Sequence, residues 1–196
     1  MNWPSAAILS AAIFGIVNII DSHIISKRMG GLRSFLLSVS VFHLTYGLIL
    51  FFLFPLPEGV GIWPVLVTII SGTIRACGVI IMLYHLKSEE VSRVIPVVYA
   101  YPIYVAIMAV PLLGETLSAL QWLAIVIVVA GSAMVSAKKS LSGSTVLVGK
   151  QFFLLFLSSL LLATADITGK YALNYISFWN LFSLTTFSLG GIFLLV

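Results

Sequence analysis

The sequence predicts an all-α membrane protein built as a multi-span helical bundle. The chain has 196 residues, of which 61% are hydrophobic and only 8% are charged, a balance far from that of soluble domains. Apolar runs of about twenty residues, the length that crosses a hydrocarbon core about 30 Å thick, recur along the whole sequence. Because unpaired backbone groups cannot face lipid, each run is expected to be a helix.

Seven membrane spans are predicted, and short connections rich in Gly, Pro, Ser and charge separate them. Ser118 and Gln121 have the spacing of a capping box at the start of the fifth span. In the fourth span, Pro96 and Pro102 are candidate helix breaks, because a proline cannot donate to the carbonyl four residues earlier. The predicted spans are residues 6–25, 34–54, 63–84, 91–112, 119–137, 152–172 and 178–196.

The charged residues argue against several classes of protein. The net charge is +4, but Lys and Arg lie mostly in the connections, where they act as topology signals and not as a nucleic-acid site. The single cysteine, Cys77, excludes an internal disulfide. The six acidic residues are scattered, and the sequence contains no HExxH, CxxC or phosphate-binding glycine loop. We therefore expect no catalytic residue, no metal and no cofactor.

An internal repeat is visible when the sequence is shifted by 145 positions. The most informative match is that of Asp21 with Asp166, since acidic residues inside membrane spans are energetically costly and rare. Repeats of this kind are typical of secondary transporters. Because the first unit holds five spans, an odd number, the second is expected to be inverted. We predict a five-helix unit at residues 1–140, followed at 141–196 by a linker and the first two helices of a second repeat, and expect the chain to be part of a longer protein.

Three ionisable residues inside spans are candidates for binding substrate or a coupling ion: Asp21, Arg75 and Asp166. A lone arginine near the middle of a span costs a few kcal/mol, so it should face a partner or a wet cavity. Spans one and three run in the same direction, which puts Asp21 about 5 Å from Arg75 along the membrane normal, against about 10 Å for Asp166. Asp21 is therefore the expected partner. The alternative is a structural ion pair that only sets helix register.

Other polar side chains near these spans have two readings. Tyr101 and Tyr104 lie one turn apart on one helix face and could form the aromatic wall of a cavity. Packing at the interface is the competing reading. His43 is expected to be a packing residue. Lys170 is expected to anchor its helix at the membrane surface, and a local ion pair with Asp166, one turn earlier, is the alternative.

Residues 89–136 resemble the fourth and fifth helices of EamA-type transporters in the drug/metabolite transporter superfamily. The resemblance depends on Pro96, on the Leu-Gly-Glu that ends the fourth span (Leu113, Gly114 and Glu115) and on Gly131. It implies ten helices in two inverted halves around a central cavity, moving small metabolites. Ala124 departs from a glycine common in relatives. For Glu115 itself, a structural role in the exit turn is the favoured reading.

Membrane orientation has two opposing indications. Lys and Arg are concentrated in the first, third and fifth connections, and the positive-inside rule then puts the N-terminus outside. The resemblance implies an N-terminus inside. Both orientations stay open.

The leading interpretation is a secondary transporter that moves small organic solutes or metabolites by alternating access. It would be a multi-pass protein of a prokaryotic inner membrane, with the solute and the lipid bilayer as partners and a proton as the candidate coupling ion. One alternative is a membrane-embedded enzyme acting on a lipid. The other is a membrane scaffold subunit that does not transport.

Overall fold

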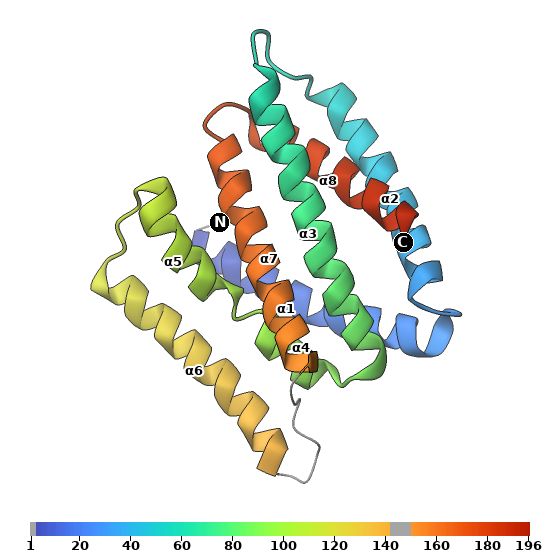
Figure 1. Ribbon diagram of the computed structural model, residues 1–196, viewed down its shortest axis with the longest axis vertical. Helices are drawn as coiled ribbons and strands as arrows, with labels where there is room; N and C mark the ends of the chain where they lie inside the picture. The colour runs from blue at the N-terminus through green and yellow to red at the C-terminus, as the bar shows by residue number, and fades with distance from the viewer. Residues whose placement is uncertain (1–2, 142–149) are drawn as a thin grey trace.

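A computed structural model describes residues 3–141 and 150–196, and this part of the chain is almost entirely helical with no strands (Figure 1). The π-helical turn η1 continues directly from the first helix. The elements are α1 (Trp3–His23), η1 (Ile24–Arg28), α2 (Leu32–Leu53), α3 (Ile62–Ser88), α4 (Val91–Val98), α5 (Tyr101–Leu113), α6 (Ala119–Leu141), α7 (Lys150–Ala172) and α8 (Phe178–Leu195).

The prediction of a multi-span helical membrane protein is confirmed. Within the described residues, six helical segments are long and apolar enough to cross a membrane, and the apolar part of α6, Ala119–Gly131, is shorter. Each of the seven predicted spans is helical, and the fourth is formed by α4 and α5 together. The predicted linker that begins at residue 141 lies almost wholly outside the described residues.

The fourth span is interrupted in its middle. Helix α4 ends at Val98 and α5 begins at Tyr101, with ψ close to zero at Tyr99 and Ala100. Pro102 lies at the start of α5, where its missing N–H leaves the carbonyl of Val98 without its helical donor. Pro96 lies inside α4 without ending it. The interruption therefore falls where the second proline removes a backbone hydrogen bond.

A tight turn joins α5 to α6. Gly114 closes α5 with φ of +67°, a left-handed conformation that glycine adopts without strain. The capping box predicted at α6 is confirmed, because the Ser118 N–H donates to Gln121 Oε1 and the Gln121 N–H donates to Ser118 Oγ. The turn therefore holds Glu115 at a defined end of the bundle.

Two helix pairs form the centre of the molecule (Figure 1). Helices α3 and α7 lie side by side, and α8 packs on both α2 and α3. The α2–α8 contact is antiparallel and reciprocal: Ser40 Oγ donates to the Gly190 carbonyl at 2.8 Å, and Ser183 Oγ donates to the Gly47 carbonyl at 2.9 Å. The differences 183 minus 40 and 190 minus 47 are both 143. The two helices therefore meet through equivalent surfaces.

The packing around Gly47 and Gly190 shows the same offset of 143 positions. A Cβ on Gly47 would meet the ring of Phe187, and a Cβ on Gly190 would meet the side chain of Leu44. Phe187 also follows Leu44 by 143 positions. Small residues at matched positions let the two backbones approach closely. Helices in a membrane associate through such close packing, because the hydrophobic effect does not drive them together in lipid.

We expect Ser40→Ala and Ser183→Ala to weaken the bundle by equal amounts. Each change removes one interhelical hydrogen bond, worth about 0.6 kcal/mol in a membrane protein. Denaturant unfolding in mixed micelles measures both. Ser38→Ala is the matched control, since Ser38 Oγ donates only within α2, to the Ser34 carbonyl. A large loss for one serine and none for the other would contradict the reciprocal interface.

Candidate functional site

The antiparallel contact between α3 and α7 sets the geometry of the site. Ser71 Oγ donates to the Ala165 carbonyl and Ser158 Oγ donates to the Gly78 carbonyl, each at 2.7 Å. A Cβ on Gly78 would lie 3.2 Å from the Ser158 carbonyl oxygen, so the helices are already in close contact there. Two hydrogen bonds about two turns apart therefore fix the register of α3 against α7.

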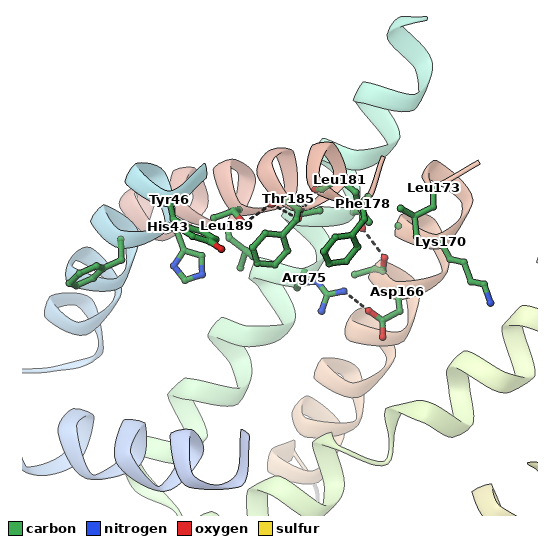
Figure 2. Close-up of a pocket in the computed structure, with 16 residues that line it drawn as sticks. His43, Tyr46, Arg75, Asp166, Lys170, Leu173, Phe178, Leu181, Thr185 and Leu189 are labelled. Atoms are coloured by element: carbon green, nitrogen blue, oxygen red, sulfur yellow. Dashed lines mark hydrogen bonds and ion pairs between the residues drawn. The ribbon is translucent and has the colours of Figure 1, made fainter. Parts of the chain in front are cut away.

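An ion pair lies beside the first of these bonds. Arg75 follows Ser71 by one turn, Asp166 follows Ala165 directly, and Arg75 Nη2 donates to Asp166 Oδ1 (Figure 2). The side chains are 35% and 31% exposed, so the pair is partly buried between helices long enough to span a membrane. A charge-assisted hydrogen bond in such a place is stronger than one at an aqueous surface.

The expectation that Asp21 is the resting partner of Arg75 is wrong, because Asp166 fills that place. The Ser71–Ala165 hydrogen bond puts these two residues at about the same height. Arg75 lies four residues beyond Ser71, and Asp166 lies one residue beyond Ala165 in the opposite direction, so their backbones are about 7.5 Å apart along the helix axes. Helical side chains lean toward the N-terminus of their own helix. In an antiparallel pair the two side chains lean toward each other, and this closes the gap. The estimate from span centres left out this lean.

A cavity of about 670 Å³ surrounds the ion pair, and we call it the Asp166 cavity. Helices α2, α3, α7 and α8 form its walls (Figure 2). Its charged lining residues are Arg75, Asp166 and Lys170, and much of the remaining surface is aromatic or aliphatic. A volume of this size suits a small organic molecule. Apolar lining residues include Phe42, Phe178, Leu181, Phe182 and Leu189.

A second cavity of about 490 Å³, the Asp21 cavity, also has Arg75 in its lining. Asp21, Asn18 and Tyr101 contribute to its lining, and Arg75 and His43 line both cavities. His43 Nδ1 lies 2.9 Å from the Val39 carbonyl and therefore donates to it. Arg75 thus borders two spaces, each of which is lined by one of the repeated aspartates.

The two tyrosines of α5 do not share one surface. Tyr101 lines the Asp21 cavity, whereas Tyr104 packs edge-to-face on Phe156 of α7 with ring centroids 5.4 Å apart. The structure thus brings Tyr101 to a cavity and Tyr104 to a packing contact. Sequence reasoning missed Asn18, which is only 4% exposed and donates to Tyr99 Oη at 3.2 Å. A buried amide within an apolar span was the available signal.

Glu115 and Lys170 form a second ion pair, which joins the α5–α6 turn to the end of α7. Lys170, which was expected to anchor its helix at the membrane surface, is thus paired with Glu115 at that end of α7. The structure also places Lys170 on the Asp166 cavity. The side chains are 55% and 32% exposed, and a pair this exposed contributes little to stability. Within the described residues, no three His, Cys, Asp or Glu side chains gather as a metal site would require.

Comparison with known families decides the classification. The sequence model of the EamA-like transporter family matches residues 1–137. The chain belongs to the EamA-like transporter family. No curated protein and no solved structure matches the chain.

The EamA-like match covers only part of the candidate site. Asp21, Arg75 and Glu115 lie within residues 1–137, whereas Asp166 and Lys170 lie beyond them. The Arg75–Asp166 and Lys170–Glu115 pairs therefore each join a residue of the EamA-like segment to a residue of α7. The site is formed only when α7 packs against α3 and the α5–α6 turn.

Proposed function

We propose that the protein is a secondary transporter that moves small organic solutes or metabolites across a membrane by alternating access. The observation that carries the proposal is the Asp166 cavity, which brings an arginine–aspartate pair together between spanning helices. Ionisable residues at this depth are costly and mark substrate or ion pathways. Membership of a transporter family agrees with this role.

We further propose two units related by inversion, residues 1–140 and the part that begins at 141. The reciprocal α2–α8 contact supports this, because two antiparallel helices exchange the same serine-to-glycine hydrogen bond across a local two-fold axis. Its offset of 143 positions is two short of the 145 that aligns Asp21 with Asp166. Inverted repeats put the binding site at their interface. Arg75 from the first unit and Asp166 from the second meet in this way.

The Asp21 cavity completes the proposed pathway. Arg75 lines both cavities, so movement of its side chain or of α3 would open one space as it closes the other. Asp21 is the candidate proton carrier, and no ion pair of Asp21 is found in the described part of the chain. We place the protein in the inner membrane of a prokaryote, as a multi-pass protein.

Thiol labelling tests the aqueous pathway. In a Cys77→Ser background, we expect a membrane-impermeant thiol reagent to label Thr185→Cys and Tyr101→Cys, which replace lining residues of the two cavities. Ile70→Cys is the control, since Ile70 of α3 is half exposed but lines neither cavity. Equal, slow labelling of all three would favour the scaffold alternative.

A transport assay tests the function itself. The complete gene product in liposomes, offered a panel of small solutes with and without a proton gradient, is expected to show saturable uptake of at least one of them. Hydrolysis or modification of an added lipid without any solute uptake would support the enzyme alternative instead.

A further inference from the structure

Two cations line the Asp166 cavity among the described residues, and each is paired with one carboxylate. Arg75 and Lys170 contribute two cations, and Asp166 contributes one acid. Glu115, the partner of Lys170, belongs to the α5–α6 turn and is not part of the lining. In Figure 2, Arg75 lies among the other labelled lining residues, and the side chain of Lys170 extends away from them. The charged groups of Arg75 and Lys170 therefore occupy separate places.

Arg75 has hydrogen-bonding capacity that the protein leaves unused. A guanidinium carries five N–H donors, and among the described residues Arg75 makes one hydrogen bond, to a single oxygen of Asp166. The side chain is 35% exposed and lines both cavities, so the remaining donors face space and not packed protein. At membrane depth these donors need water or a ligand. A planar fork of N–H groups fits a carboxylate in particular.

The serine and threonine hydroxyls of the cavity already donate to backbone carbonyls, whereas no hydrogen bond of the Tyr46 hydroxyl is found among the described residues. Ser71 Oγ donates to the Ala165 carbonyl, and Thr185 and Thr186 hydroxyls donate to carbonyls of their own helix. Among these hydroxyls, the cavity therefore offers only that of Tyr46 as a free donor to a sugar or another polyhydroxylated solute. Its aromatic rings, Phe42, Phe178 and Phe182 among them, offer apolar surface instead.

We propose that the Asp166 cavity binds small organic anions that carry an apolar body, with the carboxylate on the free N–H groups of Arg75 and the body against the phenylalanines. Lys170 attracts the anion before it reaches Arg75. This inference rests on the proposed function in so far as the cavity is the transport site, and it names the class of substrate.

Binding of matched probes tests the charge requirement on the unmodified protein. We use 3-phenylpropionate, its neutral amide and 3-phenylpropylamine, and measure dissociation constants by calorimetry on the complete protein in detergent. We expect the carboxylate to bind at least about tenfold more tightly than the amide, as charge-assisted hydrogen bonds require. We expect the amine not to bind. An amide that binds as tightly as the carboxylate, or an amine that binds best, overturns the inference.

Three variants locate the binding groups. Arg75→Lys keeps a cation beside Asp166 but loses the planar fork, and should weaken carboxylate binding about tenfold. Lys170→Gln should reduce the association rate at low salt and leave little difference at high salt. Lys27→Gln is the matched control, because Lys27 is exposed on η1 away from the cavity. Unchanged binding in both Arg75→Lys and Lys170→Gln overturns the assignment.

The outcomes separate this inference from the proposed function. Saturable transport of neutral or cationic solutes, with no carboxylate binding, would overturn the anion site and leave the transporter standing. Tight carboxylate binding that depends on Arg75, with no solute transported, would overturn the transporter proposal and leave the anion site standing.

Discussion

Replacing Arg75 by glutamine is expected to lower the initial rate of solute transport by about 30-fold or more. The change leaves the carboxylate of Asp166 without its partner between α3 and α7. Loss of one member of a desolvated pair costs about 2–5 kcal/mol. Because both side chains are about one-third exposed, we take the low end, about 2 kcal/mol, which corresponds to about 30-fold. Transport into liposomes measures the effect.

The control and the rescue make this test specific. Glu58→Gln removes a charge from the exposed α2–α3 connection and should leave transport unchanged. Exchanging the two charges, with Arg75→Asp and Asp166→Arg in one chain, should recover much of the folding stability that either change alone removes.

A double-mutant cycle distinguishes the two aspartates. We expect a large coupling energy between Arg75 and Asp166 and a coupling near zero between Arg75 and Asp21. Strong coupling to Asp21 would show that the ion pair of the structure is not the one that stabilises the protein.

Replacing Gly72 by alanine is expected to destabilise the bundle by about 1–3 kcal/mol, as overpacking of a close contact does. The new Cβ would lie 2.6 Å from Ser188 Cβ and 2.9 Å from the Thr185 carbonyl oxygen of α8. Because one of these atoms is backbone, α8 itself must shift. Thr185 lines the Asp166 cavity, so transport should fall together with stability.

Thermal unfolding in detergent, with the transport rate measured in parallel, checks this expectation. Gly15→Ala is the matched control: Gly15 lies in α1 with nothing within 4 Å of a new Cβ, and alanine in a helix is more stable than glycine by about 0.5–1 kcal/mol. A Gly72→Ala protein as stable as the Gly15→Ala protein would contradict the close α3–α8 contact.

Much of the fold could be predicted from the sequence because its signals are local. Hydropathy over about twenty residues sets a span, and Ser118 with Gln121 starts a helix through bonds to its own neighbours. The interruption before Tyr101 has the same origin, since Pro102 removes a hydrogen bond only four residues away. None of these features depends on which helices become neighbours.

The candidate site could be predicted only in part. Asp21, Arg75 and Asp166 were evident as charges in apolar spans. The use of Lys170 and Glu115 as partners, across 55 positions of sequence, had no local signal. Asn18 and its bond to Tyr99 join positions 81 apart, and the separation of Tyr101 from Tyr104 depends on where α7 presents Phe156.

The sequence by itself determined that this chain is a membrane bundle, where its helices begin and end, and which few charges lie within them. Only the tertiary structure decided that Arg75 pairs with Asp166 and not with Asp21. Hydropathy is a property of one segment, whereas an ion pair needs two helices in a particular register. Here two serine hydrogen bonds set that register, and the antiparallel lean of the side chains joins the charges.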